Sequence, residues 1–163
     1  LIAETNASLA TLHRYFRLRG RLLGVRDLRY WDIYPPIVRL EKKFPLADAK
    51  TLTLASVSPL GDAYAADLRR ALAGRFMHVY PQPGKASGAY MSGSVTDAHP
   101  YVLLNYNDDY ESLTTLAHEW GHGVHSILAN RTQPPPTARY SIFTAEIAST
   151  LNEIGRASCR ERV

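Results

Sequence analysis

The sequence predicts a mainly α-helical fold with a small β-sheet. Apolar residues recur at helical spacing over most of the 163-residue chain, which is 45% hydrophobic and 21% charged. Residues 76–106 differ, because they are rich in Gly, Ser, Pro and β-forming residues. This balance is typical of one folded domain or a piece of one, and it excludes a disordered chain and a collagen-like chain.

The elements follow from periodicity and from turn residues. Helices are predicted at residues 11–25, 46–56, 61–73, 110–129 and 140–153, and short strands at 76–79, 88–92 and 101–105. Asp108 or Asp109 is placed to cap the helix that begins at Tyr110. Pro35 and Pro36 withhold two backbone donors and fix φ, so residues 29–38 are expected to be an extended connector.

Composition also limits location and partners. No stretch reaches the about 18 apolar residues that a membrane span needs, and the first residues lack the order of a signal peptide, so we expect a cytoplasmic protein with no membrane partner. A single cysteine cannot form an intramolecular disulfide, so the fold must rest on burial. The net charge of +4 is mild, and no nucleic-acid partner is expected.

The arginines of the first predicted helix leave nucleic-acid binding open as an alternative function. The first predicted helix carries a row of arginines, Arg14, Arg17, Arg19 and Arg21. Such a row is either a solvated helix face or a site for a polyanion. A polyanion site predicts binding that weakens strongly with salt.

Both ends of the chain look truncated. The chain begins without Met inside a predicted helix, and residues 154–163, IGRASCRERV, change abruptly to a small and basic composition. These ten residues equal the translation of a widely used sequencing adapter. We therefore expect residues 1–153 to be a fragment of a larger domain and residues 154–163 to be a non-native tail. Cys159 would then be an artefact, and the codon of Glu153 would be only partly attested.

The string HEWGH at residues 118–122 matches the HExxH pattern of zinc peptidases. Residues four apart lie one above the other on a helix, so His118 and His122 can direct a ring nitrogen at one metal ion. Glu119 then lies beside the open coordination position, where a general base acts. The alternative is a pair of exposed or capped histidines on a surface helix.

The surroundings of the motif favour a metal site. The helix is apolar around much of its circumference, so its His and Glu side chains should be buried and need partners. A catalytic zinc ion takes three protein ligands and a water molecule. Glu146 is the next carboxylate that can come from a separate helix, 24 residues after His122 and beyond a proline turn. We therefore assign Glu146 as the third ligand.

These motifs, HEWGHGVHS followed by YSIFTAEIASTLNE with GKASGAYMSGS and HPYVLLN before them, resemble the oligoendopeptidase F branch of the thimet oligopeptidase family of zinc peptidases. The segments LHRYFRLRGRLLGV and YWDIYPPIV extend the resemblance over most of the chain. The resemblance implies a zincin-like, mostly helical catalytic domain that encloses short peptides in a channel. It also implies one zinc ion on His118, His122 and Glu146, with Glu119 as general base. Residues 1–153 would then be a fragment of a zinc peptidase catalytic domain.

The implied reaction is hydrolysis of peptide bonds by a zinc-activated water molecule, whose proton Glu119 accepts and passes to the leaving amine. The resemblance further implies Tyr and His residues downstream of the third ligand that stabilise the tetrahedral intermediate, and this chain contains no such segment. We therefore expect the parent protein to be an active metalloendopeptidase and the present chain to be nearly inactive. The alternatives are a non-catalytic zinc-binding helical fragment and a related HExxH zinc carboxypeptidase.

Further residues have weaker assignments. His125, on about the same helix face as the two ligands, is either a residue that orients a ligand or touches substrate, or a core histidine. Glu153, two turns after Glu146, could accept a hydrogen bond from a metal-bound histidine. The segment GKASGAYMSGS resembles a family segment that forms an edge strand along extended substrate, which makes the backbone groups of Gly88, Ala89 and Tyr90 candidate substrate contacts; a structural turn is the alternative.

Overall fold

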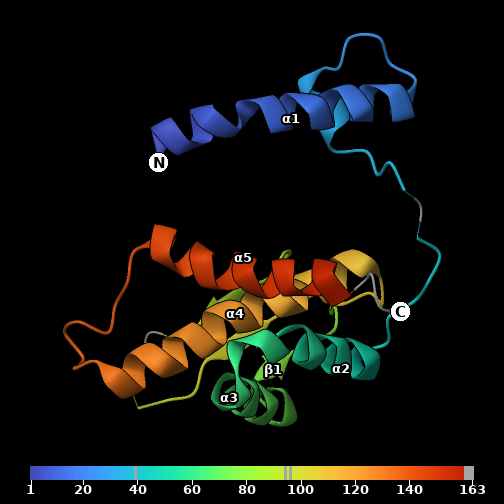
Figure 1. The fold of residues 1–163 in the computed structure, drawn as a ribbon. Helices are drawn as coiled ribbons and strands as arrows, with labels where there is room; N and C mark the ends of the chain where they lie inside the picture. The colour runs from blue at the N-terminus through green and yellow to red at the C-terminus, as the bar shows by residue number, and fades with distance from the viewer. Residues whose placement is uncertain (39, 94, 96, 160–163) are drawn as a thin grey trace. The chain divides into compact units, whose positions relative to one another are not determined.

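The fold is mainly helical with a small three-stranded sheet, which confirms the fold class predicted from the sequence (Figure 1). The computed structural model describes residues 1–38, 40–93, 95 and 97–159 of the chain. The chain divides into two compact units, Leu1–Glu41 and Lys42–Val163. Within the described residues, no helix combines the length and the apolar character that crossing a membrane requires.

The first unit consists of α1 (Ile2–Leu23) and a short 3₁₀ turn (Tyr30–Ile33). Helix α1 begins at Ile2, which agrees with the expectation that the chain opens inside a helix, although the amphipathic pattern identified it only from Thr11. The alanine-rich segment before Thr11 has high helix propensity but no clear apolar periodicity. Gly24 ends α1 in the left-handed region at φ 69°, and its N–H donates to the Arg21 carbonyl.

The segment after α1 is not the extended connector that the two prolines suggested. Asp32 Oδ2 accepts a hydrogen bond from the Arg29 N–H at 2.7 Å, which supports the 3₁₀ turn ahead of the prolines. Arg19 is only 4% exposed, and its guanidinium donates to the carbonyls of Asp32 and Pro35. The arginine row is therefore not a continuous solvated face, since Arg19 points into its own unit.

The second unit begins with two scaffold helices, α2 (Leu46–Ser56) and α3 (Asp62–Ala73). A 3₁₀ turn (Ser58–Leu60) separates them, and Gly61 at φ 91° precedes α3. The bounds of α2 agree with the prediction, and α3 begins one residue later than predicted. Both helices contribute to one apolar core, whose most fully buried large side chains are Trp120, Leu68, Leu104, Leu113 and Leu116.

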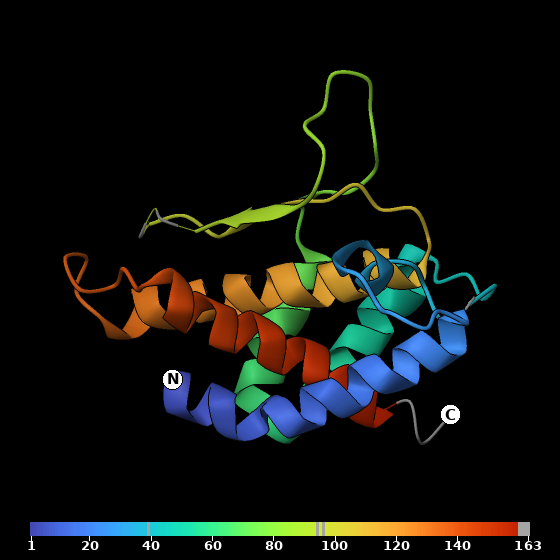
Figure 2. The same ribbon diagram turned by 90° about the horizontal axis from the view of Figure 1, so that it is seen from above.

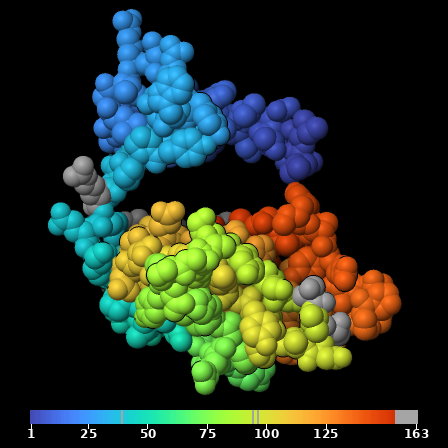
Figure 3. Space-filling model, turned by 180° about the vertical axis from the view of Figure 1, so that it is seen from behind, coloured from blue at the N-terminus to red at the C-terminus, as the bar shows by residue number. Residues whose placement is uncertain are grey.

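The sheet contains β1 (Met77–His78), β2 (Tyr90–Ser92) and β3 (Tyr101–Leu103) in the order β1-β3-β2. β3 is parallel to β1 and antiparallel to β2, with Met91 opposite Val102. β2 is therefore an edge strand. Residues 80–93, which contain β2 and the segment that leads into it, lie at the surface of this unit and are lime-green in Figure 3.

Helix α4 (Tyr110–Thr132) lies between the sheet and α5 (Ile142–Cys159), as Figure 2 shows, and it also contacts α2 and α3. Asp109 caps α4 as predicted, because its Oδ1 accepts from the Ser112 N–H at 2.7 Å. α4 continues three residues into the predicted loop, and α5 begins two residues later than predicted. Of the expected non-native tail, residues 160–163 lie outside the described residues.

Candidate metal centre

Helix α4 carries the two histidines of the motif on one face. The side chains of His118 and His122 are 25% and 12% exposed, and their Nε2 atoms lie 3.1 Å apart. The helical spacing of four residues produces this approach, since successive turns place such side chains one above the other. Both rings therefore direct the same kind of atom at one point in space.

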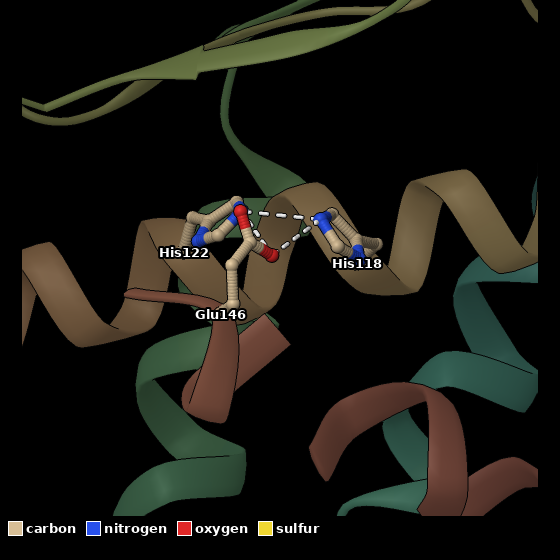
Figure 4. Close-up of side chains that lie close together, drawn as sticks. All are labelled: His118, His122 and Glu146. Atoms are coloured by element: carbon tan, nitrogen blue, oxygen red, sulfur yellow. Dashed lines mark hydrogen bonds and ion pairs between the residues drawn. The ribbon is translucent and has the colours of Figure 1, made fainter. Parts of the chain in front are cut away.

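Glu146 approaches these histidines from α5. Its Oε2 lies 3.4 Å from His118 Nε2 and 3.7 Å from His122 Nε2, as Figure 4 shows. The two helices come this close because Gly121 has no side chain; a Cβ there would lie 2.7 Å from Ser149 Cα and 2.9 Å from the Ala148 carbonyl. The three residues assigned as ligands from the sequence are thus brought together by the fold, and they form a group that could hold a metal ion.

The spacing of the three donor atoms fits tetrahedral coordination. A metal bound tetrahedrally at about 2.0–2.1 Å from each donor separates its donors by about 3.3–3.4 Å. The three measured separations are 3.1, 3.4 and 3.7 Å. Two imidazole nitrogens and one carboxylate oxygen leave a fourth tetrahedral position open, which is the arrangement of a catalytic rather than a closed structural site.

Glu119, next to His118 in the sequence, is 7% exposed. Burial raises the pKa of its carboxyl group, and the charges of Glu146 and Glu153 raise it further. A charged His118 and a hydrogen bond from the Met91 backbone oppose this increase in pKa. The contact with Met91 places Glu119 beside the edge strand β2. A buried carboxyl group with a raised pKa, beside a candidate metal site, is suited to exchange protons.

The surroundings of His122 favour the neutral form of its ring, which is the form that binds metals. Burial lowers the pKa of His122, and the neighbouring His118 lowers it further, while Glu146 and the Ala145 backbone raise it. A lowered pKa keeps the imidazole neutral near pH 7, so that a ring nitrogen can coordinate a metal.

Glu153 and His125, the two further residues that the sequence analysis placed near the candidate ligands, have different surroundings. Glu153 Oε1 lies 3.3 Å from His118 Nδ1, the ring nitrogen that points away from Glu146, so the predicted pairing of Glu153 with a candidate ligand is present in the fold. His125 stacks on the ring of Tyr140 with centroids 3.9 Å apart. Its Nδ1 is buried and has no hydrogen-bond partner within the described part of the chain. Burial lowers the pKa of His125.

The candidate substrate residues Gly88, Ala89 and Tyr90 lead into β2, the strand whose Met91 backbone contacts Glu119. Gly88 adopts φ 81°, a conformation that favours glycine, and its carbonyl accepts from Asn105 Nδ2 at 2.8 Å. Tyr90 begins β2 and is 54% exposed, and Ala89 is half-buried. In the described residues β2 pairs with β3 alone, so its other edge has no strand partner there.

Two buried polar residues of α5 were missed by the sequence analysis. Ser149 Oγ donates to Glu146 Oε2 at 2.8 Å. Asn152 accepts from the Tyr64 hydroxyl at 2.9 Å and donates to the Ala117 carbonyl at 3.2 Å, so it links α3, α4 and α5. The position of Ser149 three residues after Glu146, on the same helix face, is a signal that could have identified it.

Comparisons with known proteins agree with the site. The family model of peptidase family M3 matches residues 1–155. The oligopeptidase PepF of Bacillus subtilis is 41% identical over 154 residues, which are 94% of this chain and 23% of that protein. The group B oligopeptidase PepB of Streptococcus agalactiae is 40% identical over 153 residues, 94% of this chain and 25% of that protein. The chain thus spans about a quarter of the length of these relatives.

Solved structures show the same fold. A Chlamydophila abortus protein described as a candidate peptidase is 41% identical, with a TM-score of 0.79 over 96% of this chain and 26% of that one. PZ peptidase A, solved with an inhibitor, has a TM-score of 0.63 over 84% of this chain at 19% identity, which shows likeness of fold alone. The family match covers nearly the whole sequence, including the candidate ligands His118 and His122 on α4 and Glu146 on α5. The chain therefore belongs to peptidase family M3.

Proposed function

We propose that the chain carries the catalytic metal centre of a zinc-dependent metalloendopeptidase that hydrolyses short peptides. The observation that carries this proposal is the triangle of donor atoms on His118, His122 and Glu146, with edges of 3.1, 3.4 and 3.7 Å. Two imidazoles and one carboxylate are a ligand set that suits zinc. The relatives named oligopeptidases support the choice of short peptides as substrates.

The proposed mechanism assigns a separate task to each group. Zinc bound at the three ligands would lower the pKa of a water molecule and polarise the scissile carbonyl. Glu119 would accept the proton of the attacking water and deliver it to the leaving amine; its raised pKa strengthens it as the base in the first transfer. The backbone of Gly88, Ala89 and Tyr90 aligns the peptide along the outer edge of β2. Glu153 orients His118 through Nδ1.

The burial of Arg19 argues against the alternative that the arginine row binds a nucleic acid. A polyanion site needs a row of accessible cations, and Arg19 instead donates to the carbonyls of Asp32 and Pro35. We therefore propose short peptides as partners. A cytoplasmic location stays a prediction.

The test replaces the matching quarter of the Bacillus subtilis oligopeptidase with residues 1–153 and assays the chimera on quenched peptides blocked at both ends. Internal cleavage that a chelator abolishes and zinc restores is the expected result. Cleavage restricted to peptides with a free C-terminus would favour a zinc carboxypeptidase. A folded chimera that binds zinc without cleaving either kind of peptide would favour a non-catalytic zinc-binding segment.

A further inference from the structure

We propose that Ser149 is a positioning residue that holds the carboxylate of Glu146 in the orientation required for metal binding. This inference deepens the proposed function and rests on it. Ser149 is fully buried, and its Oγ donates to Glu146 Oε2 at 2.8 Å. That oxygen is the same one that lies 3.4 and 3.7 Å from the two histidine nitrogens. The hydroxyl therefore acts on the atom that faces the metal site.

The carboxylate is the better acceptor for the single hydroxyl proton. Ser149 Oγ also lies 3.1 Å from the Glu146 carbonyl, but a hydroxyl group donates only one proton at a time. The distance to the carboxylate is shorter, and a hydrogen bond to a charged acceptor is roughly twice as strong as one to a neutral acceptor. The hydroxyl proton therefore lies mainly towards Glu146 Oε2.

Ser149 is rigidly placed, whereas Glu146 is not. The Cα of Ser149 lies where α5 approaches Gly121 so closely that a Cβ on Gly121 would be 2.7 Å away. The side chain of Glu146 is 43% exposed and has rotatable bonds that can carry the carboxylate away from the histidines. A donor fixed at the contact between the helices removes part of this freedom before metal binds, which favours binding.

Thr150 is a matched control in the adjacent position. Its hydroxyl also donates to the Glu146 carbonyl, but the residue is exposed, and within the part of the chain that the structure describes it forms no hydrogen bond with the Glu146 carboxylate. Both hydroxyls lie within hydrogen-bond distance of the same backbone oxygen, so removal of either one changes the surroundings of the Glu146 carbonyl. Only removal of the Ser149 hydroxyl deletes the bond to the candidate ligand atom.

The experiment measures zinc affinity by competition with a chromophoric chelator for the unsubstituted chain, Ser149→Ala and Thr150→Ala. Circular dichroism of the metal-free proteins establishes that each variant is folded. We expect Ser149→Ala to bind zinc about 10- to 100-fold more weakly and Thr150→Ala to bind it normally. If Ser149→Ala does not fold, the isosteric pair Ser149→Thr and Ser149→Val makes the same comparison, with the loss expected for Val alone.

A double-mutant cycle separates positioning from general packing. In a Glu146→Ala background, removal of the Ser149 hydroxyl should change zinc affinity by less than about twofold, because the group on which it acts is absent. An equal loss in both backgrounds, or equal affinities for Ser149→Ala and Thr150→Ala, would overturn the positioning role while leaving the proposed function standing. No zinc binding by the folded, unsubstituted chain would overturn the proposed function and this inference together.

Discussion

Gly121 of α4 lies directly against Ser149 of α5 where the two helices that carry the candidate metal ligands pack together. A Cβ on Gly121 would lie 2.7 Å from Ser149 Cα, a distance at which backbone atoms must move apart. Because α4 supplies His118 and His122 and α5 supplies Glu146, this contact sets the distance between the two parts of the site. The absence of a side chain at residue 121 is therefore a condition for the donor triangle.

Gly121→Ala should reduce both stability and zinc affinity. Replacing a helical glycine with alanine gains about 1 kcal/mol of helix propensity, but overpacking a rigid contact costs about 1–3 kcal/mol. Because backbone atoms are the obstacle, we expect the cost to dominate and zinc binding to weaken by about tenfold or more as α5 is displaced. Urea unfolding and chelator competition measure the two effects.

Gly20→Ala is the control for helix propensity, since a Cβ there would meet only the Val25 carbonyl at an ordinary 3.4 Å. That variant should be neutral or stabilised. If Gly121→Ala and Gly20→Ala had equal free energies of unfolding and equal zinc affinities, the close approach of α4 and α5 at Gly121 would not constrain the site.

Asp67→Asn should destabilise the protein at neutral pH but not in acid. Asp67 is 3% exposed and accepts from Arg131 at 2.8 Å and from Arg70. The hydrogen bond from Arg131 lowers the pKa of Asp67, against the opposing effect of burial, and Arg70 contributes further. A carboxyl group whose pKa is lower in the folded state stabilises the protein above its unfolded pKa, and the stabilisation is lost as pH falls through the folded pKa.

We expect Asp67→Asn to lower the free energy of unfolding by about 1–3 kcal/mol at pH 7. The difference from the unsubstituted chain should shrink below about pH 4, near the ordinary pKa of an aspartate. Urea titrations at several pH values measure it. Exposed Asp97 provides the control substitution Asp97→Asn. A destabilisation by Asp67→Asn that is independent of pH would exclude the charge as its cause.

Glu119→Gln should abolish turnover in the chimera and retain zinc. The amide has nearly the same shape as the carboxyl group but cannot accept and deliver the proton, and general acid–base catalysis contributes about 10²- to 10⁴-fold in rate. Glu111→Gln, an exposed residue at the start of the same helix, is the control and should retain activity. Activity of Glu119→Gln within threefold of the parent would rule out the general-base role.

Local periodicity predicted the parts of the site that depend on a single helix. His118, His122 and Glu119 follow from spacing alone, and Glu146 was identified because an isolated carboxylate in an apolar helix needs a partner. The roles of Asn152 and Arg19 depend on contacts with residues distant in the sequence, which periodicity does not encode, whereas the spacing of three residues between Glu146 and Ser149 was available and was not used. The 3₁₀ turn at Tyr30–Ile33 was missed because a side-chain cap, not apolar spacing, determines it.

The most direct test of the metal centre is the zinc content of the purified chain after equilibrium dialysis, compared with that of His122→Ala, Glu146→Ala and His78→Ala. His78 is an exposed histidine on β1 and serves as the control. The account predicts about one zinc ion per chain for the unsubstituted protein and for His78→Ala, with most of it lost from the other two variants. Equal zinc in all four proteins, or none in any folded sample, would contradict a metal centre formed by His118, His122 and Glu146.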